Sequence, residues 1–300
     1  MLSVEQLSCI LHAVLEHTQC HPIEITMEAN PGDLNLDKLR QLREVGFNRL
    51  SIGIQSFRDD ELRLLGRRHN AEQAREVVRY AQQAGFDNIS IDLMYALPGQ
   101  TLADWQYNIA EALKLNVQHI SCYCLTYEPH TRLSQLVENG TLVPADEDTE
   151  NAMYDILCST LSEAGYEHYE VSNFALPNFR SRHNSGYWND TPYIGLGAGA
   201  HSYDGTKRRW NTSNLDDYIQ SSNLFEEEIL SSEQKAMEHI MLGLRTREGI
   251  VLTGELLTKA QPFLNAGELL IQTDSTTQEK RLVATQSGLH ILNRIIEALV

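Results

Sequence analysis

The chain has 300 residues, of which 42% are hydrophobic and 22% are charged, and its formal net charge at pH 7 is -17. This composition predicts a soluble globular protein with a large core, and the acidic balance argues against a broad surface for binding nucleic acids. Every apolar run is shorter than the roughly 18 residues of a membrane-spanning helix, so we expect no membrane span.

The first residues predict an amphipathic helix. Apolar side chains recur there at helical spacing, at Val4, Leu7, Ile10, Leu11, Val14 and Leu15. Glu5 occupies a position where a signal peptide would carry basic residues. We therefore expect no secretory signal and predict a cytoplasmic protein.

From residue 23 to about residue 125 the sequence repeats a strand, a turn and a helix. Strands are predicted at 23–28, 49–55, 88–93 and 119–126, and helices at 36–45, 71–84 and 102–115. Gly46 and Gly85 follow the first two helices, where glycine commonly ends a helix. This alternation predicts a parallel sheet with right-handed crossovers, either a barrel or an open doubly wound sheet. A dinucleotide-binding fold is the weaker alternative, because no G-x-G-x-x-G follows the first strand.

The remainder of the chain predicts a less regular segment and a small C-terminal domain. The expected elements are a helix at 146–164, a strand at 168–171, and an ordered loop rich in Gly, Asn and aromatic residues. A polar stretch at 213–228 and a helix at 233–244 follow, then two further helices, a β-hairpin at 269–288 and a final helix at 288–300. The last part is similar to a winged helix, but few basic residues support DNA binding there. We divide the chain into residues 1–170, 171–228 and 229–300.

Polar side chains end three of the predicted strands. Glu28, Gln55 and Asp92 lie where the carboxyl ends of parallel strands meet, which is where α/β folds gather their chemistry. Arg67 follows the second strand and adds positive charge, although a solvated surface pair with Arg68 is an alternative. Each polar side chain alone could instead cap a turn. Together they predict a pocket for a zwitterionic ligand that carries a sugar.

The scattered cysteines do not suggest a disulfide framework or a metal site. They are Cys9, Cys20, Cys122, Cys124 and Cys158. Cys122 and Cys124 would point to the same side of a strand. Small buried core residues are therefore the favoured interpretation of this pair.

Five segments, in this order, resemble the radical S-adenosylmethionine (SAM) proteins related to oxygen-independent coproporphyrinogen III oxidase. They are MEANPG, RLSIGIQSF, LGRRH, IDLMYALPGQT and LTYEP. The resemblance implies an α/β fold with an incomplete TIM-like (β/α) barrel. It also implies that Glu28, Gln55, Arg67 and Asp92 line a SAM site.

A sixth segment, HNSGYW at residues 183–188, is similar to a motif of the heme chaperone branch of this family, and GLGAGAHS at 195–202 also fits that branch. The resemblance implies that His183 binds heme iron, and that Tyr187 and Trp188 contact the porphyrin. Histidine is a common axial ligand of heme, and aromatic rings offer flat apolar surface. Taken without the resemblance, a hydrogen-bonded loop histidine is the favoured interpretation of His183, because a lone histidine is common, and the aromatic residues could cover the barrel. His201 could be a second ligand or a structural residue.

The sequence departs from the family in one respect. Radical SAM proteins hold a 4Fe-4S cluster with C-x3-C-x2-C, and neither this motif nor the G-G-G-T-P segment occurs in these 300 residues. We expect a truncated gene product or a degenerate relative that lacks two βα units and cannot cleave SAM alone. The missing units predict an exposed sheet edge that would weaken the fold or be covered by another chain, such as a second copy.

Three functions compete at this point. The favoured one is a heme chaperone that delivers heme to apoproteins, and its partners are heme and a heme-accepting apoprotein. The alternative is a radical SAM oxidase of porphyrin biosynthesis. A remnant without activity is the third.

Overall fold

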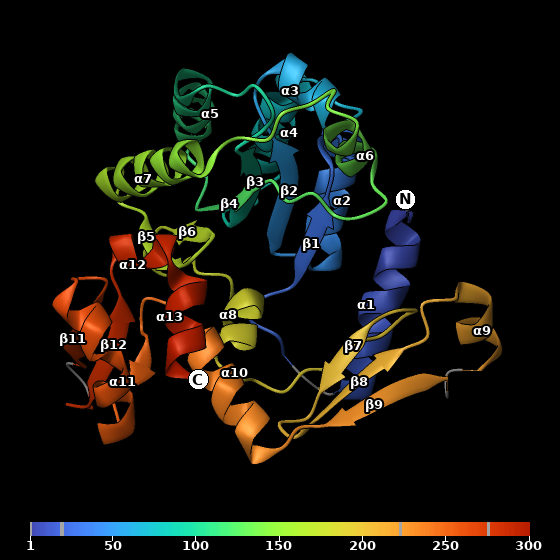
Figure 1. The fold of residues 1–300 in the computed structure, drawn as a ribbon. Helices are drawn as coiled ribbons and strands as arrows, with labels where there is room; N and C mark the ends of the chain where they lie inside the picture. Colours follow the sequence, from blue (N-terminus) through green and yellow to red (C-terminus); the bar gives the residue numbers. More distant parts are fainter. Residues whose placement is uncertain (1, 19–20, 222–223, 275–276) are drawn as a thin grey trace. The chain divides into compact units, whose positions relative to one another are not determined.

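The computed structural model describes residues 2–18, 21–221, 224–274 and 277–300. Its contacts divide the chain into two compact units (Figure 1). Unit 1 comprises residues 1–168 and 172–180, and unit 2 comprises residues 169–171 and 181–300. The three-part division at residues 170 and 228 stays a prediction.

Four parallel strands form the central part of the sheet in unit 1. They are β1 (Thr26–Ala29), β2 (Arg49–Gln55), β3 (Ile89–Tyr95) and β4 (His119–Cys124). The full strand order is β1-β2-β3-β4-β6-β5, with β6 (Asn173–Ala175) antiparallel to β4 and β5 (Glu167–Glu170) at the edge. Within the described residues this sheet ends at β1 and β5. The predicted α/β fold with an incomplete barrel is therefore confirmed.

The helices between the strands begin and end at residues suited to those positions. They are α2 (Leu36–Val45), α4 (Ala71–Gln83), α5 (Leu102–Lys114) and α7 (Glu147–Glu163). Asn35, Asn70 and Thr101 cap the first three by accepting a hydrogen bond from the first-turn backbone. Gly46 ends α2 with a φ of 118°, a conformation that favours glycine. These helices lie within one residue of the predicted ranges.

Unit 1 also contains several shorter elements besides these strands and helices. The predicted N-terminal helix is α1 (Val4–Thr18), and η1 (Pro31–Asp33) follows β1. Two short helices were not predicted, α3 (Asp59–Leu64) after β2 and α6 (Arg132–Glu138) after β4. The first strand begins at Thr26 and not at residue 23 as expected.

The two faces of the parallel sheet differ in polarity. Alternate residues of a strand point to opposite faces. On one face the side chains are apolar and essentially unexposed, as at Leu50, Ile52, Ile91 and Ile120. On the other face the register aligns Glu28, Ser51, Ser90 and His119 in one row. The strands therefore carry a packed apolar face and a polar face.

The first helices and strands of unit 2 lie in stretches for which the sequence predicted no regular structure. The stretch expected to be loop contains α8 (Arg182–Trp188) and β7 (His201–Tyr203), as well as β6 of unit 1. With β8 (Lys207–Asn211) and β9 (Phe225–Ile229), β7 forms an antiparallel sheet of order β7-β8-β9. The stretch expected to be merely polar holds β9 and α9 (Leu215–Gln220).

The C-terminal part of unit 2 has its own apolar core, which includes Leu244, Leu282 and Ile295. Its helices are α10 (Ser232–Gly243), α11 (Gly254–Asn265), α12 (Gln286–His290) and α13 (Leu292–Leu299). Its sheet has the order β10-β12-β11, with strands Ile250–Val251, Lys280–Ala284 and Leu269–Thr273. The predicted hairpin and winged-helix-like arrangement are present. The predicted final helix is interrupted at Ile291.

Among the described helices, none is both long enough and apolar enough to cross a membrane.

Candidate functional site

The polar face of the parallel sheet brings together three of the four residues predicted to bind SAM. Glu28 on β1 pairs in register with Ser51 on β2, which pairs with Ser90 on β3. Asp92 lies two residues beyond Ser90 and therefore on the same face. The charge of Glu28 raises the pKa of Asp92, and the charge of Asp92 acts on Arg67. Glu28, Asp92 and Arg67 thus share one electrostatic environment.

Asp92 is a carboxyl group that a nearby cation would stabilise. Burial raises its pKa to about 6, and the negative charge of Glu28 adds to this shift. Hydrogen bonds from Ser121 and Ser51 and the charge of Arg49 lower the pKa and only partly oppose the rise. At neutral pH this site therefore has a partly buried negative charge without full compensation.

Gln55 lies at an irregular point at the end of β2. The register of β2 against β3 shifts between Ile52 and Gln55, and Gln55 has a φ of 71°, a strained value for a residue other than glycine. Its side chain is buried and folds over Gly53, where an added Cβ would lie 2.9 Å from Gln55 Nε2. Strained backbone of this kind is common at ligand sites.

Arg67 is fixed by a residue that the sequence analysis missed. Its Nη1 donates a hydrogen bond of 3.1 Å to Asn30 Oδ1, which lies in the turn after β1. Desolvation lowers the pKa of Arg67, and the charge of Asp92 opposes this. Arg68 is exposed, so the alternative of a solvated surface residue holds for Arg68 and not for Arg67.

The sequence analysis also missed polar residues at or near the start of the strands. Arg49 on β2 is 4% exposed, and its Nε has no hydrogen-bond partner in the described residues; the same holds for Thr26 Oγ1 on β1. His119 on β4 is fully buried, and desolvation lowers its pKa to about 3, so it is neutral. The alternation of polar and apolar residues in RLSIG and HISC was the signal for this polar face.

A buried network supports the loop that carries Gln55 into the next helix. Glu61 accepts hydrogen bonds from Ser56 at 2.5 Å, from Asn108 at 2.8 Å and from Gln100 at 3.1 Å. Asn108 Oδ1 also accepts from the backbone N–H of Phe57 at 2.7 Å. The network ties the segment after β2 to α5.

The polar face holds groups that suit SAM, whereas the described residues offer no ligand set for a 4Fe-4S cluster. Arg49 Nε and Thr26 Oγ1 lack partners in the described residues and would be satisfied by polar atoms of a ligand, and the negative charge of Asp92 would be offset by a cationic group. No group of three or more His, Cys, Asp or Glu in the described residues could hold a metal ion. Cys9 is exposed and Cys122 and Cys158 are buried, while Cys20 lies outside the described residues.

In unit 2 the predicted heme motif forms a helix. Ser181 caps α8 by accepting a hydrogen bond from the N–H of Asn184. His183 and Tyr187, one turn apart and both exposed, pack edge to face at 4.9 Å between ring centroids. Tyr187 contacts Tyr193 at 4.8 Å in the same manner. The structure therefore brings His183 and Tyr187 together on one side of α8.

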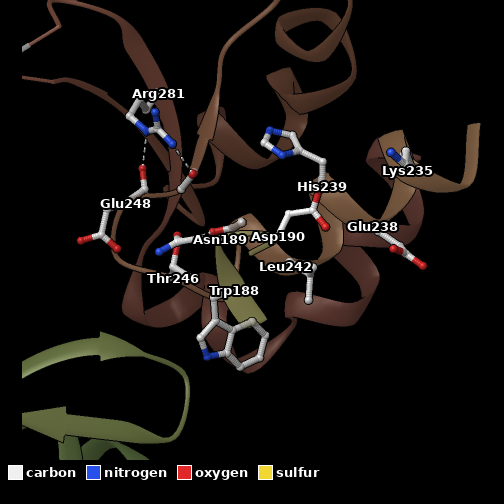
Figure 2. Close-up of a pocket in the computed structure, with 12 residues that line it drawn as sticks. Trp188, Asn189, Asp190, Lys235, Glu238, His239, Leu242, Thr246, Glu248 and Arg281 are labelled. Carbon is white, nitrogen blue, oxygen red and sulfur yellow. Dashed lines mark hydrogen bonds between the residues drawn. The ribbon is translucent and has the colours of Figure 1, made fainter. Parts of the chain in front are cut away.

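Trp188 has a different environment. It lines a cavity of about 200 Å³ in unit 2, together with polar residues of α10 and of the segments near β10 and β12. Figure 2 shows Trp188 with His239 and Arg281, which donates to the carbonyl oxygens of Glu248 and Gly249. His183 and Tyr187 are not among the residues that line this cavity. The assignment of His183, Tyr187 and Trp188 to heme therefore stays a prediction.

The comparisons with known proteins identify the family. The Radical SAM superfamily matches residues 5–111. The heme chaperone HemW of Lactococcus lactis is 34% identical over 99% of this chain and 81% of its own length. The chain belongs to the HemW family of radical SAM proteins. HemW of Escherichia coli is 33% identical over 91% of the chain and 74% of its own length. HemW of Bacillus subtilis is 40% identical, but the chain covers only 61% of it.

A solved structure shows the same fold as the HemW-family chain. The coproporphyrinogen III oxidase HemN from Escherichia coli aligns with a TM-score of 0.79 over 99% of this chain and 74% of that chain. The two sequences are 20% identical in this alignment. The likeness confirms the radical SAM fold and carries no statement about activity.

Proposed function

We propose that this chain is a heme chaperone, which binds heme and delivers it to apoproteins. The observation that carries the proposal is the HNSGYW segment, which exposes His183 beside Tyr187 on α8. Relatives named heme chaperone HemW, similar over most of this chain, support it.

In this proposal His183 binds the heme iron and Tyr187 contacts the porphyrin. A neutral imidazole is a good iron ligand, and an adjacent aromatic ring offers apolar surface to a flat ligand. A cargo that must be passed on requires an accessible site, and both side chains are exposed. Trp188, the last residue of α8, would add a second aromatic contact to the porphyrin.

We also propose that Glu28, Gln55, Arg67 and Asp92 bind SAM. The carboxylates of Glu28 and Asp92 would hold its positive groups, the Arg67 guanidinium its carboxylate, and the Gln55 amide a hydroxyl or ring nitrogen. When bound, SAM supplies a sulfonium centre whose reductive cleavage gives a radical in this superfamily. That cleavage needs a 4Fe-4S cluster, for which the described residues offer no ligand set. In this chain we therefore assign SAM a binding role only.

We also propose a partner protein, a contact between two copies of the chain and a cellular compartment. A heme-accepting apoprotein would be its partner, a second copy could cover the edge strand β1, and the cytoplasm would be its compartment. The fold shared with HemN does not distinguish a heme chaperone from an oxidase of porphyrin biosynthesis.

A hemin titration tests the proposed function. We expect the chain to shift the Soret band of hemin, and we expect His183→Ala to weaken binding at least about tenfold, since an iron ligand is lost. His12→Ala, which removes an exposed histidine of α1, is the matched control and should bind as the parent does. A parent chain that leaves the hemin spectrum unchanged would refute the function. Equal binding by His183→Ala would refute the ligand assignment.

A further inference from the structure

A second histidine of unit 2 lies in a groove that the heme motif does not include. The groove has a volume of about 480 Å³, within the range of small-molecule sites. Its lining residues are Gly199, His201, Trp210, Asn211, Thr212, Ser213, Leu224, Phe225 and Glu226. They come from the ends of β7, β8 and β9 and from the adjoining loops.

The sheet register places the chemical groups of this groove side by side. His201 on β7 pairs with Trp210 on β8, which pairs with Glu226 on β9, so all three project from the same face. The imidazole of His201 stacks on the indole of Trp210 with centroids 6.1 Å apart and an angle of 25° between planes. Trp210 Nε1 in turn donates to Glu226 Oε2 at 3.2 Å, which fixes the indole.

The glycine-rich loop before β7 is shaped to hold His201 in this place. An added Cβ at Gly195 would lie 2.0 Å from the carbonyl oxygen of His201, so only glycine allows this approach. The N–H of Gly195 donates to Ser202 Oγ at 3.0 Å. Gly197 and Gly199 have positive φ values of 115° and 71°. The position of His201 is therefore set by its backbone and by the stacked indole.

The imidazole itself is available to a ligand. His201 is exposed, and among the described residues its ring makes the stacking contact with Trp210 and no hydrogen bond. A structural histidine usually satisfies a ring nitrogen with a protein partner, as His69 does with the carbonyl of Ile54 at 3.0 Å. His201 differs from His69 in this respect.

We propose that this groove is a heme-binding site in which His201 is an axial iron ligand. The proposal rests on the proposed function and adds a site to it. The nitrogen lone pairs of an imidazole lie in the plane of its ring, so an iron bound to one of them would place the porphyrin across the edges of the His201–Trp210 stack. Leu224, which is 48% exposed, offers apolar contact. The hydroxyls of Thr212 and Ser213 could donate hydrogen bonds to the heme propionates. The Glu226 carboxylate would repel the propionates from its own side of the groove.

Hemin titrations of three variants test the site. We expect His201→Ala and His201→Gln to weaken hemin binding at least about tenfold and to change the Soret maximum. Glutamine keeps a planar polar group without a good iron ligand, so it separates ligation from packing. Trp210→Leu should weaken binding of both hemin and iron-free protoporphyrin IX, whereas His201→Gln should leave protoporphyrin binding unchanged. Added imidazole should restore the parent spectrum in His201→Ala. Far-UV circular dichroism establishes that each variant is folded.

The outcomes separate this proposal from the one before it. If the parent binds no hemin, the proposed function itself is wrong. If the parent binds hemin, His183→Ala loses it and both His201 variants keep the parent affinity and spectrum, the function stands and the His201 site is refuted. If the His201 variants lose hemin and imidazole restores it, the site is supported, whatever the effect of His183→Ala.

Discussion

At the scale of single residues, Asp92 decides how the polar sheet face responds to pH. Burial raises the pKa of Asp92 to about 6, whereas the pKa of an aspartate in an unfolded chain is about 4. Between these two pH values the carboxyl group is protonated in the folded protein and ionised in the unfolded chain. Without a ligand, the contribution of Asp92 to the free energy of unfolding therefore falls as the pH rises from about 4 to about 6. A cation bound to the ionised carboxylate would offset this loss in the free energy of unfolding.

We predict that the affinity for SAM rises as the pH increases from 5 to 7. Only the ionised Asp92 attracts the positive groups of SAM. Below pH 6, each decrease of one pH unit should therefore lower the affinity for SAM by up to about tenfold. Isothermal titration calorimetry with SAM measures this. Asp92→Asn should bind about tenfold more weakly at pH 7 and lose the pH dependence, while Asp87→Asn, at an exposed site, should behave as the parent. A flat profile in the parent would exclude this role of Asp92.

The sequence revealed some site residues and concealed others. Glu28 and Asp92 were predictable because a charge next to a buried strand is unusual. Arg49 and His119 were not recognised, since polar residues inside strands are also typical of a solvent-facing edge. Asn30 was treated as part of a turn, and its contact with Arg67 depends on the fold of both loops. The contact of Trp188 with heme was implied by the HNSGYW resemblance and stays a prediction, and the structure adds that Trp188 lines a cavity.

At the scale of elements, the buried network around Glu61 joins the loop after β2 to α5. Asn108 is fully buried and makes hydrogen bonds to Glu61, Ser56 and the N–H of Phe57. Its loss would remove one donor to the Glu61 carboxylate and leave the backbone N–H of Phe57 without this acceptor inside the protein. The network therefore fixes Ser56 and Phe57, the two residues that follow Gln55.

We predict that Asn108→Leu lowers the free energy of unfolding by about 3 to 5 kcal/mol. Urea denaturation followed by circular dichroism measures the change. Gln106→Leu, on the exposed side of the same helix, makes the same kind of substitution without touching the network and should change the free energy by less than about 0.5 kcal/mol. Equal effects of the two substitutions would show that the network is not stabilising.

The elements of the parallel sheet were predictable, whereas those of unit 2 were largely not. Residues 36–45 and 49–55 were predicted with the observed bounds, because apolar periodicity, caps and glycine stops agree there. The β7–β9 sheet was missed because its strands are short and charged, as in FEEEI, and are separated by glycines. The helix α8 was missed because HNSGYW contains glycine and asparagine, which weaken a helical pattern.

At the scale of the whole molecule, the proposed ligands belong to different units. The residues proposed for SAM lie on the sheet of unit 1, and both histidines proposed for heme lie in unit 2. The two binding activities can therefore be removed separately, by Asp92→Asn in one unit and by His183→Ala in the other. A carrier would need the heme site to stay accessible, and the exposure of His183 and His201 meets this need.

The central claim is that the chain delivers heme, and heme transfer tests it most directly. The heme-loaded chain is mixed with increasing concentrations of apomyoglobin, and the rate at which the holomyoglobin Soret band appears is recorded. We predict that this rate rises with the acceptor concentration, as in direct transfer, and that most of the heme is transferred. A rate that does not depend on the acceptor concentration would mean simple dissociation, and it would contradict delivery by this chain.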